Sequence, residues 1–103
     1  MEKARLRVSI IGFAYGSQPG WIEAALIDCA GRAWQFIAKV PKLTTECLSS
    51  DSHYPQDGFI ECEVESRRLD PASSRFILTV RTSIEARGGW TRFLVFEDKH
   101  LED

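Results

Sequence analysis

The feature that most constrains this chain is a pair of alternating runs around a short turn, within residues 21–41. Every second residue of each run is apolar, which is the period of a half-buried β-strand. The turn, residues 28–31, ends on a glycine, the residue that best tolerates a positive φ. We therefore predict a β-hairpin that stops at Pro41, because proline lacks a ladder N–H. Its predicted core face consists of Ile22, Ala24, Leu26, Trp34, Phe36, Ala38 and Val40.

Further strands are predicted at residues 3–15, 59–67, 75–82 and 90–96, and no segment has helical periodicity over ten residues. In the first strand the apolar residues switch from even-numbered to odd-numbered positions at Ile10-Ile11-Gly12. This switch predicts a β-bulge, and such a bulge lets a sheet curl. We predict one all-β domain over residues 1–103, a six-stranded antiparallel Greek-key barrel with an OB-like barrel as the alternative. At most one helical turn is expected, at Glu46-Cys47-Leu48 after a Thr44 or Thr45 cap. The segment after residue 96 is expected to fray.

Composition excludes several classes of protein. The chain has 103 residues and a net charge of −2, so bulk charge gives no reason to expect nucleic acid or an anionic membrane as a partner. No apolar run approaches 18 residues and no apolar leader follows Met1, so we expect a soluble cytoplasmic protein without a membrane partner. The three cysteines are an odd number without a CxxC pair, which favours reduced thiols.

The second half of the chain resembles a known barrel family. The turn at residues 55–58, the strands FIECEVES and RFILTVRT, and the run from Gly89 to Val95 are similar to the C-terminal β-barrel domain of elongation factor Tu. Over residues 55–96 this resemblance implies a barrel of the translation-factor type. The chain departs from that family because it lacks the final glycine-rich strand and a phosphate-binding GxxxxGK[ST] loop. The family's tRNA contacts therefore carry over to no position here.

A second resemblance is to short bacterial proteins of unknown function. It consists of a Trp-x-Glu-x-x-Leu-x-Asp hairpin from Trp21, a Lys-Val-Pro strand end at Pro41 and a Tyr-Pro-x-x-Gly turn at Tyr54. This resemblance implies a bacterial cytoplasmic origin and no established activity.

The residue types that carry chemistry form no convincing catalytic or metal-binding set. Structural zinc requires closely spaced ligand pairs, and the cysteines and histidines are not paired in this way. Cys47 and His53 share the segment 42–58, where Asp51 or Asp57 is available to orient an imidazole. The simpler interpretation is that this segment is an exposed loop whose histidine has no function. We therefore predict no cofactor, no metal and no enzyme activity, and keep a small-molecule binder or enzyme that uses this loop as a second alternative.

Charged side chains on the last two hairpins are expected to pair across strands. Glu61, Glu63 and Glu65 alternate on one strand and share a face. Arg75 and Arg81 lie on the next strand, where an antiparallel arrangement places them opposite these glutamates.

The most favoured function is a non-enzymatic protein-interaction module that acts as a monomer or weak dimer. Arginine and aromatic side chains are typical anchors of interface centres. The first alternative is single-stranded RNA or DNA binding, because arginines interleave with Trp90 and Phe93 in the second half. The predicted partner-binding residues are Trp21, Tyr54, Arg87, Trp90 and Arg92.

Overall fold

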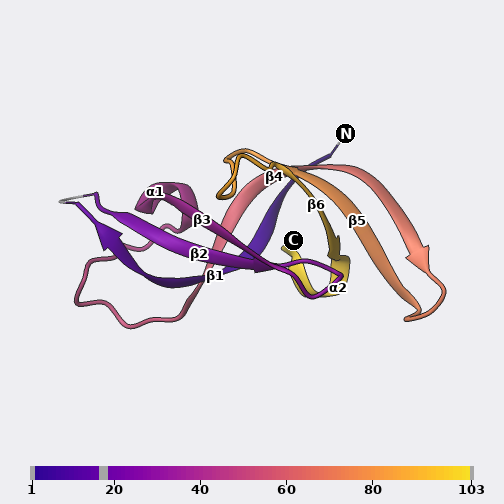
Figure 1. Ribbon diagram of the computed structural model, residues 1–103, viewed down its shortest axis with the longest axis horizontal. Coiled ribbons are helices and arrows are strands. Elements are labelled where there is room, and N and C mark those ends of the chain that lie inside the picture. Colours follow the sequence, from indigo (N-terminus) through magenta and orange to yellow (C-terminus); the bar gives the residue numbers. More distant parts are fainter. Residues whose placement is uncertain (1, 17–18, 103) are drawn as a thin grey trace.

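The computed structural model describes residues 2–16 and 19–102, which form a single antiparallel sheet with two short helices. The sheet curls into a half-barrel whose concave side holds the core (Figure 1). The elements are β1 (Glu2–Tyr15), β2 (Trp21–Ile27), β3 (Ala33–Lys39), α1 (Val40–Leu43), β4 (Gln56–Asp70), β5 (Arg75–Thr82), β6 (Arg92–Phe96), α2 (Glu97–His100) and β7 (Leu101–Glu102).

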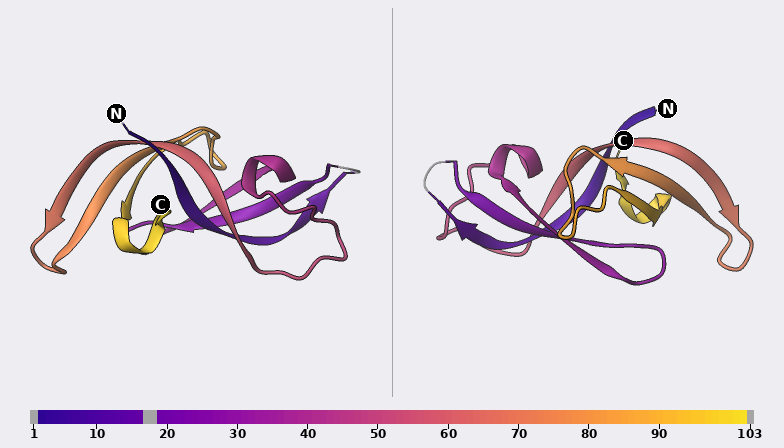
Figure 2. Two further views of the ribbon diagram at one scale, coloured as in Figure 1. Left: turned by 180° about the vertical axis from the view of Figure 1, so that it is seen from behind. Right: turned by 45° about the horizontal axis from the view of Figure 1, so that its top comes forward.

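The strand order is β3-β2-β1-β4-β5-β6, with the two-residue β7 paired to β1. The first three strands follow one another through short connections, and β4 returns to lie beside β1, which is the Greek-key arrangement. The prediction of a small all-β, barrel-like fold is therefore confirmed. Figure 2 shows the same arc from behind and from above.

The predicted bulge in β1 is present. Ile10 pairs with Ala24 and Gly12 pairs with Glu23, so Ile11 is the extra residue. Two further shifts lie in β1 between Phe13 and Tyr15 and in β4 between Val64 and Ser66. These irregularities bend long strands, and such bends allow a sheet to curl.

Aromatic side chains close the gap between the two edge strands, β3 and β6. The ring of Phe93 on β6 meets Trp34 at 5.1 Å and Phe36 at 5.7 Å between ring centroids, both edge to face. Two main-chain hydrogen bonds support this contact, Cys29 N–H to the Leu94 carbonyl and Arg87 N–H to the Gln35 carbonyl. The barrel wall is thus completed here by side chains and loops, because β3 and β6 form no ladder in the described part of the chain.

The helical turn predicted at residues 46–48 is wrong in position. The turn is α1, which begins at Val40 directly after β3. Pro41 occupies the first turn of α1, where its fixed φ fits and its missing N–H costs nothing. Thr44 ends the helix in an extended conformation, and its hydroxyl accepts a hydrogen bond from the Glu46 N–H.

Residues 97–102 are ordered, although the sequence predicted that the segment after residue 96 would fray; residue 103 lies outside the described residues. Residues 97–102 form α2, a second helical turn beyond the one expected, and β7, which pairs with β1 at Arg5 and Leu6. Figure 1 shows α2 inside the arc of β4 and β5. Two bidentate pairs hold it there, Arg67–Glu97 and Arg75–Asp98. The buried His100 places Nδ1 3.0 Å from the Arg7 carbonyl oxygen.

Strand β6 has apolar residues on both faces but is covered on one face only. Phe93 and Val95 are buried, whereas Leu94 is 42% exposed. Phe96 lies on the outer face, where the Arg75 guanidinium stacks on its ring at 3.7 Å. The stacked arginine therefore covers part of the outer face of β6.

Packing around Gly58 generates a stability prediction. A Cβ at Gly58 would lie 2.6 Å from Ile10 Cδ1 and 2.7 Å from the Leu43 carbonyl oxygen. We expect Gly58→Ala to lower the free energy of unfolding by about 2 kcal/mol through overpacking, measured by urea denaturation. Gly12→Ala is the matched control, because a Cβ there meets nothing within 4 Å, and it should be close to neutral. Equal effects of the two substitutions would contradict this packing.

Candidate functional site

The most prominent exposed side chain near a structured loop is Trp90, which is 59% exposed. It follows Gly88 and Gly89, whose φ angles of 94° and 90° favour glycine. Hydrogen bonds from Ala86 N–H to the Trp90 carbonyl and from Gly89 N–H to the Ala86 carbonyl close this turn. The indole is therefore presented from a hydrogen-bonded turn with little loop to order on binding.

Trp90 belongs to a continuous row of three side chains, which we call the Trp90 ledge: Arg32, Trp34 and Trp90. The rings of Trp34 and Trp90 meet edge to face with 6.1 Å between centroids. The Arg32 guanidinium lies 4.1 Å from the centroid of the Trp34 ring. A guanidinium beside two indoles is the composition typical of interface anchors.

Asp28 holds Trp34 and the main chain of Arg32, two members of the Trp90 ledge, in place. Its carboxylate accepts hydrogen bonds from the Trp34 indole N–H and from the main-chain N–H groups of Ala30 and Arg32, each at 2.9 Å. Burial acts to raise the pKa of Asp28, but these donors outweigh it and the pKa lies below its usual value. The carboxylate thus stays ionised, and it orients Trp34 from within the β2–β3 turn.

Hydrogen bonds to Gln35 of β3 hold Arg87 close to the Trp90 ledge. Its N–H donates to the Gln35 carbonyl at 2.7 Å, and its Nη1 lies 3.4 Å from the Gln35 side-chain oxygen. Within residues 2–16 and 19–102 the Arg87 guanidinium has no ion pair. Of the five predicted partner-binding residues, the structure brings Arg87 and Trp90 to one place.

Trp21 lies at the opposite end of the β2–β3 hairpin. It pairs with Lys39, whereas Trp34 pairs with Leu26 near the turn. Its ring stacks on Tyr15 at 5.8 Å, and the Lys39 ammonium lies 5.3 Å from the ring centroid. Trp21 is therefore part of a separate aromatic contact on the outer face of the sheet.

Tyr54 and Arg92 also lie outside the ledge. The Tyr54 hydroxyl donates to the Ser49 carbonyl at 2.7 Å, and its ring packs against the core. Arg92 makes a bidentate pair with Glu65, with Nε 2.7 Å from Oε1. The hydrogen bond from Arg92 lowers the pKa of the Glu65 carboxyl, and the charges of Arg92 and Arg81 act in the same direction. Arg81 contacts both Glu63 and Glu65, as expected, but Arg75 pairs with Asp98 instead of the glutamates.

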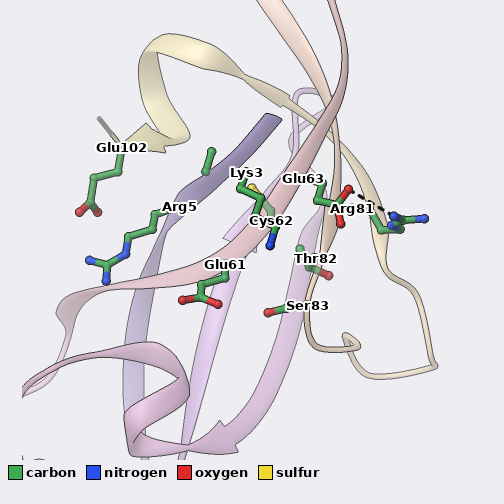
Figure 3. Close-up of a pocket in the computed structure, with 10 residues that line it drawn as sticks. Lys3, Arg5, Glu61, Cys62, Glu63, Arg81, Thr82, Ser83 and Glu102 are labelled. Atoms are coloured by element: carbon green, nitrogen blue, oxygen red, sulfur yellow. Dashed lines mark ion pairs between the residues drawn. The ribbon is translucent and has the colours of Figure 1, made fainter. Parts of the chain in front are cut away.

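A shallow groove of about 910 Å³ crosses the sheet at β1, β4 and the end of β5 (Figure 3). Cross-strand partners of opposite charge line it: Lys3 faces Glu63, and Arg5 faces Glu61 on one side and Glu102 on the other. Three cationic and three anionic side chains line the groove, so it favours no ligand charge. Opposite charges on facing residues favour the pairing of neighbouring strands.

The catalytic alternative gains no support from geometry. Cys47 and His53 are both exposed, and no hydrogen bond joins their side chains in the described segments. Cys62 lines the groove from a buried position, and burial raises the pKa of its thiol to about 11. Across residues 2–16 and 19–102 no three His, Cys, Asp or Glu side chains are grouped to hold a metal ion. No helix in this part of the chain is long and apolar enough to cross a membrane.

Comparisons with protein-family models, with curated proteins and with solved structures found no match to this chain. The resemblance of residues 55–96 to the barrel domain of elongation factor Tu therefore stays a prediction.

Sequence reasoning missed two members of the ledge. Trp34 was assigned to the core because it shares the parity of Phe36, and it is in fact half-buried. The position of Arg32 in the turn carried no periodic signal. One signal was available: Asp28 begins the tight turn and Trp34 follows it closely, and a turn aspartate is well placed to accept a hydrogen bond from a nearby indole N–H.

The Arg92–Glu65 pair gives a titration prediction. In Arg92→Gln the pKa of Glu65 should rise toward its usual value, because the donor that favours the ionised carboxylate is lost. The carbon chemical shift of the Glu65 carboxyl, followed by NMR against pH, measures this. The stabilising effect of the pair exists above the ordinary Glu pKa and is lost as pH falls through the lowered one. Arg81→Gln is the control and should cause a smaller shift, because Arg81 lies 3.9 Å from Glu65. An unchanged Glu65 pKa in Arg92→Gln would contradict the pairing.

The thiols give a second prediction. Iodoacetamide at pH 8 should alkylate the exposed Cys47 at least about 100-fold faster than Cys62, because Cys62 is buried and rarely ionised. Peptide mass spectrometry against time measures both rates. A rate for Cys47 well above that of a free cysteine would revive the Cys47–His53 alternative.

Proposed function

We propose that this protein is a non-enzymatic interaction module that binds a protein partner at the Trp90 ledge together with Arg87. One observation carries the proposal: a largely exposed tryptophan is held by a hydrogen-bonded turn against a second tryptophan. Burying such an aromatic surface in a partner gains free energy at a small entropic cost.

The composition of the site supports a protein over a nucleic acid. The loop carries Glu85 beside Arg87, and Asp28 lies beside Arg32, so acidic and basic groups balance around the two indoles. Single-stranded nucleic acid binding relies on an excess of positive charge that follows the backbone. Six arginines suggested the nucleic-acid alternative: Arg67, Arg68, Arg75, Arg81, Arg87 and Arg92. All of them except Arg68 and Arg87 are engaged in ion pairs with carboxylates.

The test is capture by the immobilised protein from a cell lysate, with mass spectrometry of the bound proteins. We expect Trp90→Ala to reduce the captured partner at least about ten-fold, as for an interface anchor. Leu69→Ala is the matched control, because Leu69 is an apolar side chain of similar exposure on β4 and should leave capture unchanged.

Two outcomes would overturn the proposal. One is a captured set that is the same for the wild-type protein and for Trp90→Ala, with circular dichroism showing that both are folded. The other is binding that disappears after nuclease treatment, which would favour the single-stranded nucleic acid alternative.

A further inference from the structure

The edge of β3 that faces away from β2 has main-chain groups with no hydrogen-bond partner among residues 2–16 and 19–102. Hydrogen bonds from Asp28 N–H to the Arg32 carbonyl and from Val40 N–H to the Gly20 carbonyl mark the two ends of the β2–β3 ladder. Hydrogen-bonded and non-hydrogen-bonded pairs alternate in an antiparallel ladder. The register therefore turns the main chain of residues 34, 36 and 38 toward β2 and that of residues 35, 37 and 39 outward.

This outward edge is rich in donors. The Gln35 carbonyl already accepts from Arg87, and Lys39 is the N-cap of α1, a position whose carbonyl accepts the first intrahelical bond. What remains along the edge is the N–H of Gln35, Ile37 and Lys39 and the carbonyl of Ile37. Three donors and one acceptor suit a ligand with more acceptors than donors.

The part of the β3 edge that has free main-chain groups is short, and the turn of residues 86–90 blocks one end of it. Gln35 and Lys39 are four residues apart, which corresponds to about 13 Å of strand. At the Gln35 end the turn of residues 86–90 contacts β3 through Arg87, so a strand cannot continue past it. A chain that pairs here must end or turn away near Arg87, and a chain end is the simpler of the two. An antiparallel chain would end there with its carboxylate, whereas a parallel chain would start there with an α-amino group.

The side chains at this edge agree with a chain terminus. Arg87 offers an exposed guanidinium with no carboxylate partner in the described residues. Ile37 is 46% exposed in the middle of the edge and would contact an apolar side chain opposite. Lys39 does not interfere, because its ammonium already donates to the Pro19 carbonyl at 3.0 Å.

We propose that the β3 edge binds the free C-terminus of a partner protein as a short antiparallel strand, with its carboxylate at Arg87. The inference rests on the proposed function and names the chemistry of the partner. The main-chain groups of Ile37 and Lys39 pair with the incoming strand, and a β-branched residue packs on Ile37. The carboxylate supplies the excess acceptors that the donor-rich edge requires.

The test uses the whole protein and two probes, the peptide acetyl-Thr-Val-Thr-Val with a free C-terminal carboxylate and the same peptide as its C-terminal amide. Amide chemical shifts of Gln35, Ile37 and Lys39 are followed by NMR during titration. We expect the carboxylate peptide to shift these three amides and to bind about ten-fold more tightly than the amide peptide. Arg87→Gln should remove that difference and keep the fold, because the bond to Gln35 comes from the Arg87 main chain.

Three outcomes would overturn the inference: no shift of the β3 amides at millimolar carboxylate peptide, equal affinity for the two peptides, or an Arg87→Gln variant that still prefers the carboxylate. Failure here is separable from failure of the proposed function. Lysate capture that depends on Trp90 but not on Arg87 would keep the ledge as an interface and remove the C-terminus as its ligand.

Discussion

The contact of Phe93 with Trp34 and Phe36 is the interaction on which the rest of this structure depends. A six-stranded sheet with two open edges has no reason to keep a closed shape unless something joins those edges. Here an edge-to-face cluster joins them, from β6 on one side and β3 on the other. Such aromatic pairs are worth about 0.5–1.5 kcal/mol each beyond the burial of their area. The core residues inside the arc are sealed from water on this side by the cluster.

The same contact creates the site. Because β6 is drawn against β3, the loop that precedes β6 comes to lie along the β3 edge, where Arg87 bonds to Gln35. Trp90 then contacts Trp34 and still keeps 59% of its surface exposed. The contact between β3 and β6 thus brings together an exposed tryptophan, a guanidinium and a strand edge with free main-chain groups. The interactions that close the fold and the groups that are free for a partner lie in the same place.

Much of the fold follows from period-two alternation, and the exceptions have physical reasons. The hairpin of Ile22 and Phe36, the bulge at Ile11 and the strand of Leu78 were predictable, because burial of one face dictates the side on which each residue lies. The position of α1 was missed because Pro41 both ends a strand and begins a helix well. The order of the last segment was missed because it depends on Arg67 and Arg75, partners far away in the sequence.

The site was only half predictable for a related reason. Residue type singled out Arg87 and Trp90, and their two-glycine turn marked a special loop. Their neighbours Arg32 and Gln35 came from another hairpin, and alternation contains no information on which loops meet. Trp21, Tyr54 and Arg92 have the same residue types, but they are engaged with Tyr15, Ser49 and Glu65, respectively.

The pairing of β7 with β1 has a consequence for how the chain acquires its shape during synthesis. Arg5 and Leu6 are synthesised long before Leu101 and Glu102, the residues that cover their outer edge. The edge of β1 at Arg5 and Leu6 therefore stays open while the intervening strands are made. An unpaired strand edge can pair wrongly, so this part of β1 is exposed to mispairing until residues 101–102 have been made.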